Sequence, residues 1–114
     1  MAVATSSRRR NFERKTAHLQ DIFSLFQGKV VCGDDPQYKM AGKPAPDIFL
    51  TTAKVFLDRD VGSAGEAPTP AQLEERSKGL VFEDAVPGLQ AGKRAGMNGE
   101  YPIAQTKLPC SLSL

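Results

Sequence analysis

The sequence predicts an α/β fold, with a parallel sheet of three or slightly more strands flanked by helices. Three short apolar runs carry this prediction, because segments with helical spacing separate them. The runs are residues 1–5, 29–32 and 79–82. Strands that alternate with helices are joined by right-handed crossovers, so the three are expected to lie parallel in one sheet. A length of 114 residues allows one domain at most.

The segment between the first two runs predicts two short helices. Apolar side chains recur within residues 10–26, with a break near Ala17 and His18, and Gly28 ends the second helix. The next helix is expected to begin at Pro46 and Asp47, because proline suits a first helical position and an acid suits the helix dipole there. Its apolar stripe is Ile48, Phe49, Ala53, Phe56 and Leu57.

The second half of the chain has clearer signals for where helices begin and end. Residues 58–69 are typical of an exposed loop. Thr69 is expected to cap a short helix that opens at Pro70, with Gln72 near the capping-box position. The last helix is expected over residues 87–95 and ends at Gly96. Residues 98–102 have the composition of a turn, and we expect residues 98–114 to form a divergent tail behind a core of residues 1–97.

Composition and charge are those of a globular protein. The net charge of +2 excludes a chain that binds nucleic acid over its whole surface, although Arg8, Arg9, Arg10, Arg14 and Lys15 cluster near the N-terminus. The favoured interpretation of this cluster is a solvated helix start; a phosphate-facing role and a nucleic-acid arm stay open, and nucleic acid is the least expected partner.

Cysteine usage and hydropathy indicate the cellular compartment in which the protein is expected. Cys32 and Cys110 lie far apart, show no metal-type spacing and indicate no disulfide framework, which favours a reducing compartment. No run of eighteen apolar residues or signal-peptide core is present. We therefore expect a cytoplasmic protein with no membrane partner. Residues 1–10 are rich in Ser and Arg as in a mitochondrial transit peptide, but 2–5 fit a strand end better.

Polar residues that follow the apolar runs are the candidates for chemistry. Glu83 and Asp84 end the third run, where the pockets of open α/β sheets lie, and carboxylate oxygens suit Mg²⁺, although Asp84 could instead cap the next helix. The segment Thr5-Ser6-Ser7 offers hydroxyls and N–H groups to an anion, or an ordinary helix cap. Lys43 offers a positive charge, or is a surface lysine. We expect no Asp-x-Asp or Ser/His/Asp set to provide a nucleophile, so the predicted site is incomplete.

Two other polar features have simpler interpretations. Asp34-Asp35-Pro36 follows the second run, and turn chemistry accounts for it. His18, the single histidine, lies in a helical stretch and is expected to be structural or exposed.

Taken together, these segments resemble the haloacid dehalogenase (HAD) superfamily. The resemblance rests on Ala4-Thr5-Ser6-Ser7, on residues 23–26 and 33–36, on the run Gly42-Lys43-Pro44-Ala45-Pro46-Asp47-Ile48-Phe49-Leu50, and on Val81-Phe82-Glu83-Asp84-Ala85 with Gly88, Ala91 and 95–97. Within the superfamily the chain looks most like the β-phosphoglucomutase-like branch, nearest its pseudouridine-5′-phosphatase members. The resemblance covers about residues 2–97.

The resemblance implies a Mg²⁺-dependent phosphoryl-transfer site on a Rossmann-like sheet. Thr5 stands at the second motif, whose hydroxyl, with the next N–H at Ser6, holds the transferring phosphoryl group. Lys43 stands at the third motif, whose lysine neutralises phosphate and nucleophile. Glu83 and Asp84 match the acids that hold Mg²⁺. Ser7 and Arg8 lie where some relatives contact substrate.

The resemblance also implies what is missing. The first motif of the family, of the Asp-x-Asp-Gly-Thr type, carries the nucleophile and the acid/base upstream of the second, and the cap domain that selects substrate is expected to be absent as well. We therefore expect a fragment of a phosphomonoester hydrolase for small sugar or nucleoside phosphates that is itself inactive. The alternative is a non-catalytic module that binds phosphate or a protein partner, with self-association through an exposed sheet edge.

Overall fold

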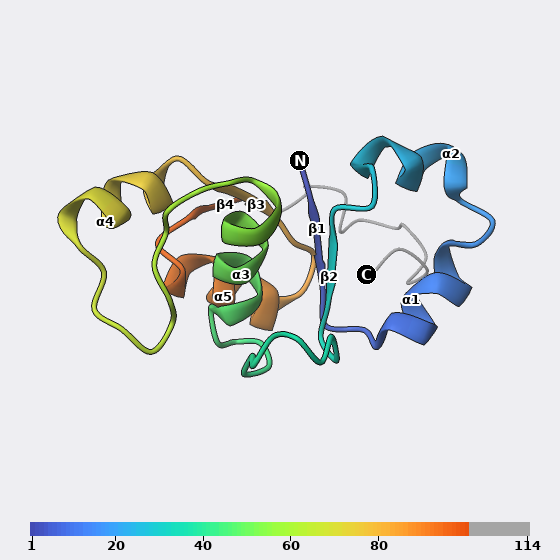
Figure 1. Cartoon of the computed structure of the whole chain (residues 1–114), viewed down its shortest axis with the longest axis horizontal. Helices are drawn as coiled ribbons and strands as arrows, with labels where there is room; N and C mark the ends of the chain where they lie inside the picture. Colours follow the sequence, from blue (N-terminus) through green and yellow to red (C-terminus); the bar gives the residue numbers. More distant parts are fainter. Residues whose placement is uncertain (101–114) are drawn as a thin grey trace.

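The computed structural model describes residues 1–100 (Figure 1). The remainder of the expected tail, residues 101–114 with Cys110, lies outside the described residues. Four strands form two separate parallel pairs. Strand β1 (Val3–Thr5) pairs with β2 (Val30–Cys32), and β3 (Leu80–Phe82) pairs with β4 (Asn98–Glu100). The α/β class with parallel strands is confirmed.

The expected single sheet of three strands is wrong. Within residues 1–100, β1 is hydrogen-bonded to β2 and β3 is hydrogen-bonded to β4, so β1 and β3 are not neighbours in one sheet. The partner of β3 is β4, which occupies residues expected to form a turn. Asn98 and Gly99 have turn composition, but a β-carbon on Gly99 would lie 2.8 Å from Leu89 Cδ1. The glycine therefore lets the strand pass close to the neighbouring helix, a use of glycine that composition does not distinguish from a turn.

The helices of the first half follow the predicted order. Helix α1 (Arg9–Thr16) is separated by the expected break from α2 (Gln20–Phe23), which continues as the 3₁₀ turn η1 (Ser24–Phe26). Helix α3 (Asp47–Phe56) begins one residue later than expected, because Pro46 is its N-cap and not its first residue.

The helices of the second half also lie where the sequence placed them. Helix α4 (Pro70–Ser77) has the expected capping box: Gln72 N donates to Thr69 Oγ1 at 3.2 Å, and Thr69 N donates to Gln72 Oε1 at 3.0 Å. Helix α5 (Val86–Arg94) begins one residue earlier than expected and ends one residue earlier. Within residues 1–100, no helix is long and apolar enough to cross a membrane.

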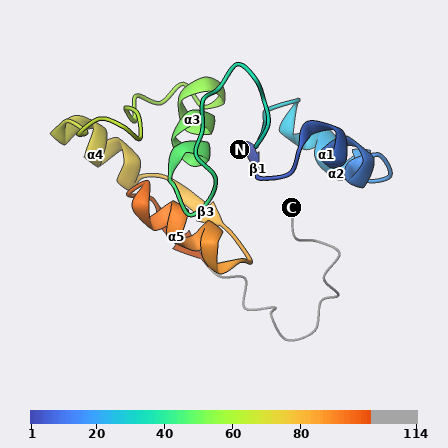
Figure 2. The ribbon, with the colours of Figure 1, turned by 90° about the horizontal axis from the view of Figure 1, so that it is seen from below.

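The described residues form two apolar cores, one built on the β1–β2 pair and one built around helix α3. Helices α1 and α2 lie on one side of β1 and helix α3 on the other (Figure 2). The first core contains Val3, Phe12, Val30 and Cys32, with Phe23 and Phe26 packed against it. Side chains alternate along a strand, so Ala4 and Val31 point to the α3 face. The second core contains Leu50, Ala53, Val61 and Ala95.

Helix α3 connects the two strand pairs. It contacts β1 and β2 on one side and α5 on the other, and α5 in turn packs on β3 and β4. The carboxyl ends of β1 and β3 lead into Ser6 and Glu83, and the loop before α3 carries Lys43. The side of β3 that carries Leu80 and Phe82 stays open: these side chains are 51% and 71% exposed, and Val86 at the start of α5 is 57% exposed.

Candidate phosphate-binding site

Lys43 lies in a short loop that is fastened at several points before helix α3. Asp47, in the first turn of α3, accepts a hydrogen bond from Ala41 N at 3.0 Å through its Oδ1 atom. Ala45 N donates to Gly42 O at 3.0 Å, and the Lys43–Pro44 peptide bond is cis. Arg94 of α5 donates to Pro44 O at 3.3 Å. The loop is thus held to both helices that flank it.

The ammonium group of Lys43 forms an ion pair with Glu83. Lys43 Nζ lies 2.5 Å from Glu83 Oε2, and the two side chains are only 10% and 9% exposed. The same nitrogen lies 5.0 Å from the centre of the Phe49 ring, within the range of a cation–π contact. The prediction left open a surface lysine. The side chain is instead largely buried and directed toward the carboxyl end of β3.

Glu83 rests on the first turn of helix α5. A β-carbon on Gly88 would overlap the carboxylate of Glu83, so the acid packs directly on the helix backbone. The other carboxylate oxygen, Oε1, accepts from Asp84 N at 3.3 Å. Asp84 is exposed and is not the helix cap that the sequence allowed, because Ala85 is the N-cap of α5 and makes no side-chain cap bond.

Residues Thr5 to Ser7 form a tight turn at the carboxyl end of β1. Thr5 is fully buried, and its Oγ1 atom accepts from Ser7 N at 3.1 Å. The alternative of an ordinary helix cap is not realised, because Arg8 is the N-cap of α1 and has no side-chain cap bond. Gly33 N donates to Ser7 O at 3.1 Å, which joins this turn to the end of β2.

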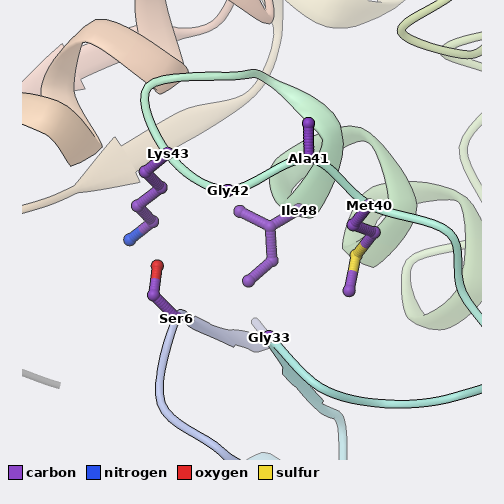
Figure 3. Close-up of a pocket in the computed structure, with 7 residues that line it drawn as sticks. All are labelled: Ser6, Gly33, Met40, Ala41, Gly42, Lys43 and Ile48. Carbon is purple, nitrogen blue, oxygen red and sulfur yellow. The ribbon is translucent and has the colours of Figure 1, made fainter.

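A pocket of about 90 Å³ lies between these loops. Its lining includes Ser6 from the end of β1, Gly33 from the end of β2, the loop of Lys43, and Ile48 from α3. In Figure 3 the hydroxyl of Ser6 and the ammonium of Lys43 point toward one another across it. A hydroxyl and a cation beside so small a space can hold a compact anion.

The structure brings together three of the residues predicted from sequence. Ser6 and Lys43 line the pocket, and Glu83 contacts Lys43. Thr5 lies directly beneath, but its side chain is enclosed. Arg8 and Asp84 are exposed, and Ser7 is half-buried.

The predicted metal ligands form only a small donor set. Glu83 and Asp84 are adjacent, and within the described residues no group of three His, Cys, Asp or Glu side chains is arranged to hold a metal ion. Carboxylate oxygens are the donors that Mg²⁺ prefers, and this ion is commonly held by one or two carboxylates with water and phosphate oxygens. The donor chemistry therefore fits Mg²⁺, although Glu83 is also the partner of Lys43.

Sequence reasoning missed an ion pair next to this site. Asp35, expected to serve a turn, is 6% exposed and is bound by Arg9. In the sequence, Asp35 is only an acid that follows a strand, and Arg9 is one of several clustered arginines. Neither feature indicates that the two residues pair. The other cations of the cluster, Arg8, Arg10, Arg14 and Lys15, are exposed, as the favoured interpretation expected.

The sequence contains one literal Asp-x-Asp, at Asp58-Arg59-Asp60, which lies far from the pocket. It follows helix α3, whereas Lys43 precedes that helix, and ten helical residues span about 15 Å. Asp60 Oδ1 accepts from Gln72 Nε2 at 3.0 Å, and Arg59 pairs with Glu75 at 2.7 Å. This segment therefore fastens the loop to helix α4 and supplies no nucleophile to the pocket.

Comparison with known families decides the relationship. The model of the haloacid dehalogenase-like hydrolases matches residues 1–96. The chain belongs to this family. HAD-like hydrolases typically use Mg²⁺, in keeping with the carboxylates after β3.

Several curated relatives of this HAD-like chain are named as phosphatases. It is 43% identical over 98 residues to (DL)-glycerol-3-phosphatase 2 of Arabidopsis thaliana, covering 86% of this chain and 35% of the relative. It is 42% identical over 95 residues to a probable pseudouridine-5′-phosphatase of Drosophila melanogaster, covering 83% and 35%. It is 40% identical over 96 residues to the bifunctional riboflavin kinase/FMN phosphatase of Arabidopsis thaliana, covering 84% and 20%. The chain thus spans about a third or less of these relatives.

Proposed function

We propose that this chain forms the phosphate- and magnesium-binding part of a HAD-type phosphomonoester hydrolase. The observation that carries the proposal is the position of Lys43: its ammonium group is paired with Glu83 after β3 and faces Ser6 after β1 across a small pocket. In parallel α/β sheets, ligands bind at the carboxyl ends of strands. A cation fixed there by two loops is well placed for phosphate oxygens.

Each residue of the site has a separate role in this proposal. Lys43 neutralises charge on the phosphoryl oxygens, while Ser6 donates from its backbone N–H and its hydroxyl. Thr5 accepts from Ser7 N and so fixes the turn that presents Ser6, and its own hydroxyl proton stays available as a donor. Glu83 orients Lys43. Ser7 and Arg8 are the nearest candidates for contact with the rest of a substrate.

Glu83 and Asp84 would hold Mg²⁺. When bound there, the ion would stabilise negative charge on the phosphoryl oxygens as a Lewis acid. The contribution of the chain is to place two adjacent carboxylates at the carboxyl end of β3, with Glu83 held against α5 at Gly88 and in contact with Lys43.

The 114 residues by themselves are proposed to bind phosphate without turning substrate over. The described residues that line the pocket include a serine and a lysine but no carboxylate, thiol or imidazole. Ser6 has no histidine beside it to act as a base, since the single His18 lies between α1 and α2. Loss of a catalytic nucleophile commonly costs several orders of magnitude in rate.

The substrate class that best fits is a small phosphomonoester such as a sugar or nucleoside phosphate. The relatives named above include phosphatases for glycerol 3-phosphate, pseudouridine 5′-phosphate and FMN. These compounds share a phosphate ester and little else. The part of each relative that this chain matches is therefore proposed to recognise the phosphate group. We also propose that the protein acts in the cytoplasm.

Phosphate release and phosphate binding, measured side by side, test this function. Release from small phosphomonoesters is followed with Mg²⁺ and with chelator for the 114-residue chain and for Asp84→Asn. We expect neither protein to exceed the blank, and we expect the chain to bind inorganic phosphate about tenfold more tightly than Lys43→Met. Chelator-sensitive turnover that Asp84→Asn abolishes would overturn the proposed inactivity. Equal phosphate affinity for the chain and Lys43→Met would overturn the site.

A second candidate function is that of a protein-interaction module that self-associates. The observation that favours it is the exposure of Leu80, Phe82 and Val86, which lie along β3 and the start of α5. Unpaired strand edges with apolar side chains promote association. Light scattering across a concentration series tests it: a dimer that Phe82→Lys dissociates supports this function, and a monomer at all concentrations contradicts it.

A further inference from the structure

The Arg9 side chain is half-buried and bound to the turn after β2, whereas its neighbours Arg8 and Arg10 are exposed. Its guanidinium makes a two-pronged contact with Asp35: Nε donates to Oδ1 at 3.1 Å, and Nη2 donates to Oδ2 at 2.6 Å. Nη2 also donates to Val30 O at 3.0 Å. Fork-shaped pairing of this kind fixes both distance and orientation, which a single point charge does not.

Asp35 is bound to the end of β2 as well as to Arg9. It is 6% exposed, and its Oδ2 atom also accepts from Cys32 N at 2.8 Å. Its neighbour Asp34 accepts from Arg9 N at 2.7 Å. The turn after β2 is therefore tied both to the backbone and to the side chain at the start of α1.

This network borders the pocket without entering it. Gly33 precedes the two acids and lines the pocket, as does Ser6. The two residues are so close that a β-carbon on Gly33 would lie 2.6 Å from Ser6 O, and Gly33 N donates to Ser7 O. Fixing the turn after β2 against α1 therefore fixes the wall that carries Ser6.

We propose that Arg9 and Asp35 are a positioning pair that holds Ser6 and Gly33 in place for the phosphate group of a ligand. The inference rests on the proposed phosphate-binding function. Arg9 acts through the turn at Asp34 and Asp35, because Nε and Nη2 of its guanidinium are engaged by Asp35 and Val30. The Arg9→Lys variant keeps the positive charge but cannot make the two-pronged contact with Asp35. It therefore tests the geometry of the pair separately from its charge.

The test compares inorganic phosphate binding in variants whose stability is measured alongside. Arg9→Gln and Arg9→Lys are measured beside Arg10→Gln, an exposed neighbour, and beside Thr69→Ala, which removes the cap of α4. We expect both Arg9 variants to bind phosphate about tenfold more weakly. Arg10→Gln and Thr69→Ala should stay within about twofold of the parent chain. Urea unfolding of each variant shows how much stability it has lost.

A second readout needs no ligand. The amide of Gly33 donates to Ser7 O, so its hydrogen exchange reports whether the turn is held. We expect exchange to quicken at least tenfold in the Arg9 variants and to stay unchanged in Thr69→Ala. Arg9→Lys provides the test if Arg9→Gln fails to fold.

Three outcomes would overturn the positioning role. The first is unchanged phosphate affinity in both Arg9 variants. The second is an equal loss in Thr69→Ala, which would reduce the effect to stability. The third is unchanged Gly33 exchange. If the parent chain binds no phosphate at all, the proposed function fails, and the Gly33 readout alone decides whether the pair holds this turn.

Discussion

The carboxylate of Glu83 packs against the backbone of Gly88, so closely that helix α5 has no room for a β-carbon there. This contact sets the direction in which Glu83 leaves the end of β3. The acid is pressed toward Lys43, and the two are in contact at 2.5 Å. A glycine in the first turn of a helix thus constrains the geometry of an ion pair between two residues that lie forty positions apart in the chain.

Substitution of Gly88 by alanine is expected to displace Glu83. The added methyl group overlaps the carboxylate, and overpacking of this kind costs about 1–3 kcal/mol. In a Glu83→Ala background the same substitution should cost nothing, because the overlapping atoms are gone and alanine favours the helix by up to about 1 kcal/mol. Urea unfolding of the four proteins measures this sign change. An equal loss in both backgrounds would show that Gly88 matters for another reason.

The Lys43–Glu83 pair is expected to contribute far more than an exposed pair. Removing one partner of a largely buried pair leaves an uncompensated charge, so Lys43→Met and Glu83→Gln should each cost about 3 kcal/mol or more. The double variant should lose less than the sum of the two. Arg59→Met, which breaks a pair whose arginine is 59% exposed, serves as control and should cost less than about 1 kcal/mol. Additive losses at Lys43 and Glu83, measured by urea unfolding, would contradict the coupling.

Much of the fold could be predicted because its signals are local. The capping box at Thr69 and Gln72 and the break near Ala17 depend on residues within a few positions, and the structure has both. The division into two strand pairs could not be predicted in this way. It depends on β4, where Gly99 serves close packing against Leu89 and not a turn. A composition rule treats these two uses of glycine alike.

The site residues could likewise be predicted where their signals are local, and their long-range contacts could not. Lys43, Ser6 and Glu83 were identified because each follows a strand or lies in a distinctive motif, and they meet at one edge. Nothing local indicated that Glu83, a proposed metal ligand, would be the partner of Lys43. The same holds for Asp35, whose role depends on a long-range contact with Arg9.

Acid should weaken the fold through Asp35. Burial by itself raises the pKa of this carboxyl, but the hydrogen bonds from Arg9 and from Cys32 N outweigh burial and lower it. A lowered pKa stabilises the fold above the ordinary value of about 3.9, and this contribution is lost as pH falls below that value. The stability difference between the parent chain and Asp35→Asn should therefore be constant from about pH 5 to 8 and shrink below about pH 3.9. A difference that already shrinks between pH 7 and 5 would contradict the lowered pKa.

Cys32 is expected to be unreactive in the folded chain. It is fully buried in the first core, and burial raises the pKa of its thiol to about 11. The reactive species is the thiolate, so at pH 8 the folded chain should alkylate at least about 100-fold more slowly than the same chain in urea. Iodoacetamide labelling of a Cys110→Ser variant, in which Cys32 is the single cysteine, measures this ratio.

The same pKa shift predicts the direction of an alkaline effect. The folded state holds the thiol proton more tightly than the unfolded state, so stability should fall as pH rises from about 8.5 toward 11. Cys32→Ala, which has no thiol to ionise, should lack this component of the alkaline loss and serves as the control. Two results together would contradict a buried neutral thiol at this position. The first is labelling at similar rates with and without urea, and the second is an identical dependence of stability on alkaline pH in the parent chain and Cys32→Ala.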